Sequence, residues 1–511
     1  MKSTYNMINS PQWPKIPIFS HYYGFAFYFF IMSVSPVFAH DVELARQLYN
    51  AHPTFHDTTL KHRRFKHNDI MPLLDRVANQ GKMTVDVVGK STEKRTIRKV
   101  QIGSGPTPVL LWSQMHGDEA TATMALFDIM NFLQASGDEW DEFRANLLAG
   151  LTIHMVPMLN PDGAERWQRR TALDIDMNRD ALRLQSPESV ILKKLQQTIK
   201  PLVGFNLHDQ NPRYSVGQTG KQAVLSFLAT AYDRDRNVND VRQRSMQLIA
   251  GLNRVLQPLI PGQIARYDDE FEPRAFGDNI QKWGTTLILI ESGGYKGDSE
   301  KMEIRRLNFV AILSALNSIA NRGYEAETIT DYAAIPENGR ALFDMLIRNV
   351  GVVRNGVRTT MDVGINRYEV NTNNARDFRY ESKIEDLGDL STFYGLDEID
   401  ASGLDLVPAN VYPETLKSTD KLAELNIPEL YKQGTVVFRM RKTSRAKLYE
   451  QLGSASVHVL MDGEFPAKPL KLGQIPTFLL KQGEQLQYIV VNGTVVKADE
   501  QPAGKRFSIV E

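Results

Sequence analysis

Residues 286–290, Thr-Leu-Ile-Leu-Ile, lead directly into Glu291 and have the character of a short, buried strand. Two other apolar runs end in the same way near a side chain that can bind a metal: residues 109–113 (Val-Leu-Leu-Trp-Ser), shortly before His116, and residues 203–207 (Val-Gly-Phe-Asn-Leu), directly before His208. Short apolar runs flanked by turn residues are typical of strands in a mostly parallel sheet. Because ligands of open α/β sheets bind beyond the carboxyl ends of the strands, the three runs predict one functional edge.

The residue types at this edge indicate a metal-dependent hydrolase. Two histidines and one glutamate are a known ligand set for catalytic zinc, and they leave a fourth position open for water. A further carboxylate nearby can act as the general base. The chain contains no cysteine, which excludes disulfides, thiol catalysis and thiolate ligands. Zinc must therefore be held by histidine and carboxylate.

The composition is that of an ordinary globular protein, long enough for two or three domains. Hydrophobic residues make up 42% and charged residues 23% of the 511 residues. The formal net charge is +0, so the chain lacks the basic excess of a nucleic-acid-binding protein, and we expect no nucleic-acid partner. The densest basic stretch, residues 61–67, is interpreted as the solvated face of a helix.

The N-terminal segment, residues 1–39, has the pattern of a signal peptide. Basic residues precede an apolar stretch at residues 22–32, and Val37-Phe38-Ala39 forms a small-residue cleavage site. The apolar stretch is short for a membrane span, so we expect cleavage, no stable membrane insertion, and a periplasmic or secreted protein. Because the segment before the apolar stretch is long, an uncleaved signal anchor remains the alternative.

Residues 40–325 alternate between strand and helix patterns. Further elements are predicted in this region: strands at residues 85–89, 99–103 and 152–156, and helices after His116, from Ser186 to Gln197 and from Arg305 to Ala320. These elements predict an α/β fold with a mixed, mostly parallel sheet flanked by helices. His154 alternates with apolar neighbours in its strand and is interpreted as structural.

Residues 326–511 are predicted to form a separate, β-rich C-terminal domain. Three dipeptides in it are typical of tight hairpin turns: Asn355-Gly356, Asp462-Gly463 and Asn492-Gly493. This region offers no cluster of catalytic residue types, and its single histidine, His458, is interpreted as structural. The sequence does not assign a role to this domain.

Six motifs occur in the order seen in zinc carboxypeptidases of the carboxypeptidase A (M14) family, which the chain resembles over roughly residues 60 to 320. They are His116-Gly117-Asp118-Glu119, Asn160-Pro161-Asp162-Gly163, Arg166-Trp167-Gln168-Arg169, Asn178-Arg179, His208 and Glu291. The first motif alone arises often by chance. The complete ordered set, with most members at strand ends, is specific.

The resemblance implies one zinc ion per chain, held by His116, Glu119 and His208. It implies that Glu291 is the general base that takes a proton from a zinc-activated water. Arg169 matches the family arginine that stabilises the oxyanion of the tetrahedral intermediate.

The resemblance also assigns substrate-binding residues. Asn178 and Arg179 match the pair that grips the terminal carboxylate of the substrate, because a planar guanidinium suits a carboxylate. Tyr267 lies near the place of the family's mobile tyrosine. The following segment, residues 268–274, departs from the digestive enzymes, and so does Asp180. Because that segment contains both acidic residues and an arginine, the preference for a terminal residue stays open.

Three of these assignments have structural alternatives: Glu291 as a member of a buried ion pair, Arg166 or Arg170 in place of Arg169, and an ion pair of Arg179 with Asp176 or Asp180. Burying a charge at the end of an apolar run is costly unless it has a function, which favours the catalytic interpretation of Glu291.

The sequence therefore predicts an exported zinc metallocarboxypeptidase that removes C-terminal residues from peptides or from cell-wall peptide stems. The first alternative is an N-acyl amino acid deacylase resembling aspartoacylase and succinylglutamate desuccinylase, which share part of the pattern. The Asn160–Gly163 motif, Arg166 and Arg169 favour the peptidase. A non-catalytic binding protein is the second alternative, although every expected catalytic position is filled.

Overall fold

The structure, a computed structural model, describes residues 36–441, 448–449, 452, 456–461, 470–500 and 504–510. The predicted signal peptide therefore lies almost entirely outside the described residues, and its export and cleavage stay predictions. Among the residues that are described, no helix combines the length and the apolar character needed to cross a bilayer. From Asp41 onward the chain forms one unit of contacts.

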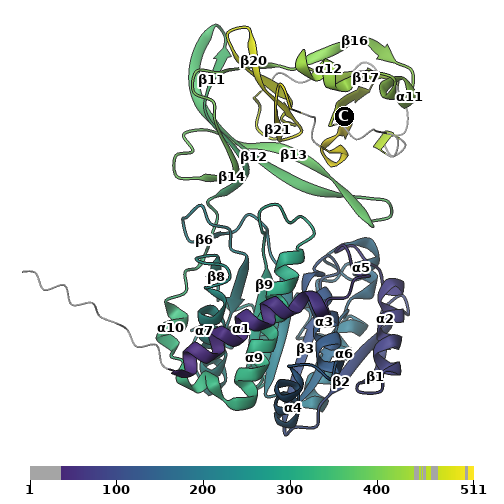
Figure 1. Cartoon of the computed structure of the whole chain (residues 1–511), viewed down its shortest axis with the longest axis vertical. Coiled ribbons are helices and arrows are strands. Elements are labelled where there is room, and N and C mark those ends of the chain that lie inside the picture. The colour runs from purple at the N-terminus through teal and green to yellow at the C-terminus, as the bar shows by residue number, and fades with distance from the viewer. Residues whose placement is uncertain are drawn as a thin grey trace, which may run out of the picture. The chain divides into compact units, whose positions relative to one another are not determined.

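An eight-stranded sheet forms the centre of the α/β part, in the order β1-β2-β4-β3-β5-β9-β7-β8 (Figure 1). Its strands are β1 (Thr84–Lys90), β2 (Thr96–Ile102), β3 (Thr107–Ser113), β4 (Leu151–Val156), β5 (Val203–Asp209), β7 (Leu225–Leu228), β8 (Ile264–Arg266) and β9 (Thr286–Ser292). β3 pairs in parallel with β4 and β5, and β5 pairs in parallel with β9, whereas β2 runs antiparallel to β1 and β4. The predicted α/β fold with a mixed, mostly parallel sheet is confirmed.

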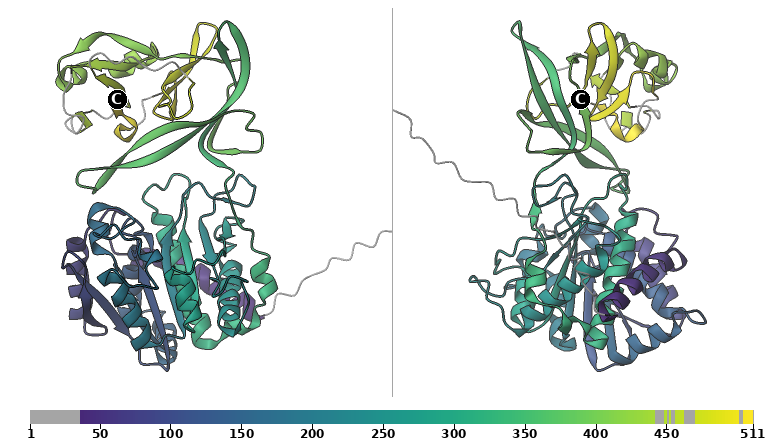
Figure 2. Two further views of the ribbon diagram at one scale, coloured as in Figure 1. Left: turned by 180° about the vertical axis from the view of Figure 1, so that it is seen from behind. Right: turned by 60° about the vertical axis from the view of Figure 1, so that its left-hand side comes forward.

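Helices cover both faces of this sheet (Figures 1 and 2). They are α1 (Pro36–Phe55), α2 (His67–Asn79), α3 (Thr121–Gln134), α4 (Asp141–Gly150), α5 (Pro161–Arg166), α6 (Pro187–Ile199), α7 (Asp240–Leu256), α8 (Phe276–Lys282), α9 (Met302–Asn321) and α10 (Ile329–Ala333), with short 3-10 turns at Met177–Arg179 and Gly323–Ala326. The helix predicted from Ser186 is present as α6, and the Oγ of Ser186 caps it by accepting a hydrogen bond from the backbone N of Ser189 at 3.2 Å.

Strand β3 is apolar at successive positions because its two faces enter different cores. Val109 and Leu111 belong to the core that also contains residues of α3 and α9. Leu110 and Trp112 belong to a second core, which contains Leu192 of α6. A strand buried on both faces loses the polar alternation of a surface strand, which is why the run could be recognised in the sequence.

A buried ion pair connects the two helices that follow the functional strands β3 and β9. The guanidinium of Arg305 on α9 donates to the carboxylate of Asp128 on α3 at 2.5 and 2.6 Å. His52 of α1 lies 2.9 Å from the same carboxylate, and Arg305 also donates to the carbonyl of Leu60 at 2.7 Å. Because all of the Asp128 and Arg305 contacts are inside the protein, this network fixes α1, α3 and α9 relative to the sheet.

The remainder of the chain is rich in strands, which form sheets of their own. β13-β12-β11-β15-β19-β20-β21 form one sheet with β14 paired to β11, and β16-β17-β18-β22 form another. The strands are β10 (Asn338–Gly339), which pairs with β6 (Ser215–Val216), β11 (Leu342–Arg354), β12 (Val357–Thr372), β13 (Asp377–Gly388), β14 (Tyr394–Asp400), β15 (Asp405–Pro408), β16 (Asn410–Leu416), β17 (Thr435–Met440), β18 (His458–Met461), β19 (Phe478–Gln482), β20 (Gln485–Val491), β21 (Thr494–Lys497) and β22 (Ile509–Val510), with helices α11 (Thr419–Ala423) and α12 (Ile427–Lys432) and a 3-10 turn at Lys505–Phe507.

Two of the three predicted hairpin turns are confirmed. Asn355-Gly356 joins β11 to β12, and Asn492-Gly493 joins β20 to β21, and all four residues have positive φ, as this kind of tight turn requires. Asp462-Gly463 lies outside the described residues. Tyr332 and Ile335 still pack in the core of the α/β part, so the change to β structure comes later than residue 325. The division into two domains stays a prediction.

The basic stretch at residues 61–67 is not the solvated face of a helix, and that interpretation is wrong. Arg63 and Arg64 are buried, and each donates to a different oxygen of Glu369 on β12 at 2.7 Å. The guanidinium of Arg64 also stacks over the rings of Trp167 and Phe378, at 4.6 and 4.9 Å from their centroids. This cluster, which we call the Arg63–Arg64–Glu369 clamp, joins the α/β part to the β-rich part.

We predict that Glu369→Gln destabilises the protein by about 2–3 kcal/mol, slightly less than the loss of one partner of a fully buried pair. The amide keeps the size of the side chain but leaves two buried guanidinium groups without their negative charge. Urea denaturation measures the effect. The matched control is Glu381→Gln on β13, because Glu381 is 40% exposed and lies 3.9 Å from its cation, Arg379. Equal stability of the two variants would contradict the role of the clamp.

Candidate metal centre and active site

The turn between β3 and α3 carries the first two predicted ligands. The backbone N of Glu119 donates to the carbonyl of His116 at 3.1 Å, so the two side chains leave the same tight turn. Gly117 is required between them, because a Cβ atom there would lie 2.0 Å from the backbone of Gly163. Gly117 and Gly163, which belong to two separate sequence motifs, therefore allow the turn that carries His116 and Glu119 to pack against α5. We call this turn, residues 116–119, the ligand turn.

The third predicted ligand, His208, is the direct neighbour of Glu291 across the parallel strands β5 and β9. The Nδ1 of His208 lies 2.7 Å from Oε2 of Glu119 and 3.2 Å from Nδ1 of His116. The Nδ1 of His116 lies 2.8 Å from Oε1 of Glu119. The three ligand atoms are all within 4.8 Å of one another, so the structure brings the predicted ligands together at one point.

The chemistry of this donor set fits zinc. Two imidazole nitrogens and one carboxylate converge, and the two Nδ1 atoms face each other, an arrangement that a shared cation stabilises. The carboxylate of Asp176 lies 3.2 Å from Nε2 of His116. This contact favours the proton on Nε2 and leaves the lone pair of Nδ1 directed at the cluster. Burial opposes ionisation of Glu119, but the charges of His116 and His208 outweigh it and hold the pKa of that carboxyl well below its usual range.

Glu291 lies at the same edge of the sheet as a half-buried residue. Burial, followed by the charges of Glu119 and Asp209, raises the pKa of Glu291 well above its usual range. Its Oε2 has no hydrogen-bond partner among the described residues. Burial and the charge of Glu291 also raise the pKa of Tyr267, whose ring contacts Tyr214 edge to face at 6.0 Å. The role of Tyr267 in substrate binding stays a prediction.

Arg169 is the arginine that reaches the ligand cluster. Its Nη1 lies 3.3 Å from Oε1 of Glu119, and its Nε donates to Asp176 at 3.0 Å. Arg166 and Arg170, the two competing candidates, pair with groups outside the cluster. The position of Arg169 agrees with the role that the family resemblance implies, and the role itself stays a prediction.

Asn178 and Arg179 lie in the 3-10 turn that follows Asp176. The Oδ1 of Asn178 accepts a hydrogen bond from the backbone N of Phe276 at 2.9 Å. The Nε of Arg179 lies 3.2 Å from a carboxylate oxygen of Glu272, and its side chain is 39% exposed. Asp180, an expected structural partner of Arg179, instead accepts backbone hydrogen bonds just before α6. Arg179 is thus available to a ligand that displaces Glu272.

The sequence suggests Asp176 only as a partner of Arg179 and does not predict its position beside His116. Asp176 receives hydrogen bonds from Arg169 and from the backbone N of Asn178, and it orients His116. The signal was its spacing, two residues before Asn178.

We predict that Asp176→Asn weakens zinc binding about 10–100-fold, the usual effect of losing a residue that orients a ligand. The amide no longer favours the proton on Nε2 of His116. Competition with a chromophoric chelator measures the affinity. Asp174→Asn is the matched control, since Asp174 is two residues away and its side chain is 91% exposed. An affinity of Asp176→Asn equal to that of the control would show that Asp176 does not orient the ligand.

Similarity to known proteins was found for parts of the chain. Residues 70–200 match the family model described as zinc carboxypeptidase. The chain is 26% identical over 175 residues to a probable carboxypeptidase 2 of Trichophyton verrucosum, a match that covers 33% of this chain and 30% of that protein. It is 28% identical over 147 residues to a probable carboxypeptidase 2 of Arthroderma benhamiae, covering 27% and 26%. The chain thus spans less than a third of the length of these curated relatives.

Among solved structures, a metallo-carboxypeptidase from Burkholderia cenocepacia matches with 16% identity and a TM-score of 0.41, covering 51% of this chain and 70% of that chain. The segment matched by the family model contains His116, Glu119, Arg169, Asn178 and Arg179. His208 and Glu291 follow it and reach the same site through the pairing of β5 with β9. Residues 70–200 are thus similar to zinc carboxypeptidases, and this stretch carries five of the predicted site residues.

Proposed function

We propose that this protein is a zinc-dependent metallocarboxypeptidase that removes single residues from the C-termini of peptides. The observation that carries the proposal is the convergence of His116, Glu119 and His208 beside Glu291, in a chain of which residues 70–200 match the zinc carboxypeptidase model. One zinc ion at this site would act as a Lewis acid that polarises the scissile carbonyl and makes water acidic enough to lose a proton near neutral pH.

Glu291 performs the proton transfers in this proposal. It accepts a proton from the attacking water and passes it to the amine that leaves when the peptide bond breaks. In the metal-free protein, burial raises its pKa and favours the protonated form. A nearby dication favours the carboxylate, so the group becomes a base when the site is loaded. The free Oε2 of Glu291 is consistent with a group that exchanges protons.

Arg169 stabilises the negative charge that develops on the carbonyl oxygen. Its guanidinium is held by Asp176 at 3.0 Å and is 43% exposed, so one side of it remains open to a ligand. A fixed positive charge needs little reorganisation when the oxyanion forms. Arg179, with Asn178 beside it, binds the terminal carboxylate after Glu272 moves away.

We propose further that the protein is exported and acts on peptides or cell-wall peptide stems outside the cytoplasm. The pattern of residues 1–39 supports this proposal.

The test of the proposed function is mass spectrometry of a mixed peptide library incubated with the zinc-loaded protein, residues 40–511. We predict loss of single C-terminal residues and inhibition by a chelator, with recovery when zinc is restored. The residues that are lost report the preference for a terminal side chain. If a folded, zinc-loaded protein cleaves no peptide but hydrolyses N-acyl amino acids, the proposal is wrong and the deacylase takes its place.

We predict that Glu291→Gln retains zinc but loses at least about 10³-fold in kcat, because the amide cannot accept a proton and general base catalysis is worth roughly 10²–10⁴-fold. Zinc content by atomic absorption and turnover of a peptide identified in the library measure the two effects. The control is Glu325→Gln, which changes an exposed glutamate outside the site. Full activity of Glu291→Gln would exclude this glutamate as the base.

A further inference from the structure

A cavity of about 920 Å³ opens beside the metal centre and extends to the β-rich part. Asp118 and the ligand Glu119 line it at one end. Its volume lies at the upper end of the range of small-molecule sites, roughly 300–1,000 Å³, which is large enough for more than one residue of a peptide. The cavity therefore extends the active site beyond the groups that perform the chemistry.

Both parts of the chain supply the walls of this cavity. The α/β part contributes Trp167, the loop from Asp209 to Arg213, and Tyr295 with its neighbours. The β-rich part contributes Arg367, Tyr368, Glu369, Tyr380, Arg506 and Phe507. The Arg63–Arg64–Glu369 clamp, in which Arg63 and Glu369 are themselves lining residues, holds the two walls together. The β-rich part is therefore a structural component of the cleft that contains a metal ligand.

The described residues that line the cavity do not include those proposed to bind the terminal carboxylate. Among its described lining residues are neither Asn178 nor Arg179, and neither Tyr267 nor Glu272. A peptide whose carboxylate is bound by Arg179 has its last peptide bond at the metal ligands. The residues before that bond then enter the cavity.

The charges of the cavity wall are largely balanced. Each of these cations has a carboxylate nearby: Arg213 with Asp344 at 3.1 Å, Arg367 with Asp397 at 3.2 Å, Arg506 with Asp377 at 3.0 Å, Lys296 with Asp397 at 3.3 Å and Lys301 with Asp209 at 2.9 Å. Trp167, Tyr295 and Tyr368 line the same cavity. Aromatic surfaces among paired charges suit an extended peptide of either charge, because they contact its main chain and its apolar side-chain stems.

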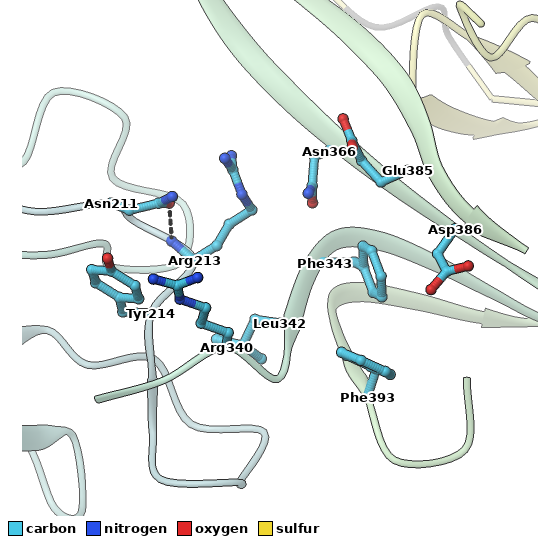
Figure 3. Close-up of a pocket in the computed structure, with 10 residues that line it drawn as sticks. All are labelled: Asn211, Arg213, Tyr214, Arg340, Leu342, Phe343, Asn366, Glu385, Asp386 and Phe393. Atoms are coloured by element: carbon cyan, nitrogen blue, oxygen red, sulfur yellow. Dashed lines mark hydrogen bonds between the residues drawn. The ribbon is translucent and has the colours of Figure 1, made fainter. Parts of the chain in front are cut away.

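A second cavity, of about 530 Å³, is lined by residues of both parts of the chain (Figure 3). The two share Asn211 and Arg213, which lie in the loop after the ligand His208. In Figure 3, Arg213 and Arg340 lie on one side of the second cavity, and Glu385 and Asp386 of the β-rich part lie on the other. The channel is therefore bounded by both parts along its length.

Tyr368 of β12 stands between the two cavities. Its side chain is 37% exposed, its ring lines the first cavity, and Arg213 lies over the ring at 5.1 Å. Its hydroxyl donates to Glu385, which lines the second cavity, at 2.7 Å. This hydrogen bond and the arginine hold the ring in one orientation in the channel.

We propose that the β-rich part forms the second wall of the substrate channel, and that Tyr368 binds the peptide segment that precedes the scissile bond. The preferred substrate is then an extended peptide of several residues rather than a dipeptide or a single N-acyl amino acid. The inference rests on the proposed carboxypeptidase function and adds the part of the substrate that this function leaves unspecified.

The test compares an N-blocked dipeptide with an N-blocked pentapeptide that has the same last two residues, chosen from those the library shows to be cleaved. The zinc-loaded protein, residues 40–511, is used in all cases. We expect Tyr368→Ala to lower kcat/KM for the pentapeptide about tenfold, mainly through KM, as is usual for a buried aromatic contact in an interface. The same variant should leave kcat/KM for the dipeptide unchanged.

Tyr394→Ala is the matched control, since Tyr394 is a 40% exposed tyrosine of the β-rich part that lines neither cavity among the described residues. Tyr295→Ala tests the opposite wall and keeps the experiment decisive if Tyr368→Ala is unstable. Equal rates for both substrates in the wild type and in both wall variants would overturn the inference and leave the proposed function intact. Failure of the wild type to cleave either peptide would instead contradict the proposed function.

Discussion

The parallel pairing of β5 with β9 is the constraint on which the site depends. It places His208 and Glu291 side by side at the carboxyl ends of two strands that are buried in the middle of the sheet. Their separation is fixed by the spacing between hydrogen-bonded strands, about 5 Å, and not by the flexibility of a loop. The other predicted site residues, among them His116, Glu119 and Arg179, come from turns beside the carboxyl ends of these strands. A shift of one residue in the register would turn one of the two side chains to the opposite face.

Rigid connections behind the sheet protect this geometry. The ligand turn continues into α3, and β9 is followed by α9, and the buried pair of Asp128 and Arg305 joins these two helices. Breaking one partner of such a pair is strongly destabilising, because it leaves the other charge unpaired in the interior. The carboxylates and histidines of the site are themselves unfavourable to bury. The sheet and the network behind it hold them together, which agrees with the general rule that functional groups are supported at the expense of local stability.

The sequence predicted the features that depend on local patterns. The strands around β3, β5 and β9 were recognisable because their apolar runs end at His116, His208 and Glu291, and hairpin turns were recognisable from Asn-Gly pairs. The sequence pattern does not predict contacts between residues that lie far apart along the chain. The sequence pattern indicates a solvated Arg63, because its counter-charge, Glu369, is on a strand of the other part. The channel could not be predicted for the same reason, since its walls come from segments that only the tertiary structure brings together.

The ion pair of Arg179 with Glu272 has a kinetic consequence. Glu272 is part of the same chain, so its carboxylate is present at a high effective concentration, on the order of millimolar for a tethered group. Every free carboxylate that binds Arg179 must compete with it. A substrate gains additional contacts along the channel, whereas the released amino acid has only its own small surface. The internal competitor lowers the affinity of both ligands by the same factor. The product, which has no contacts along the channel to compensate, is then the weakly bound one, and the site clears after each turnover.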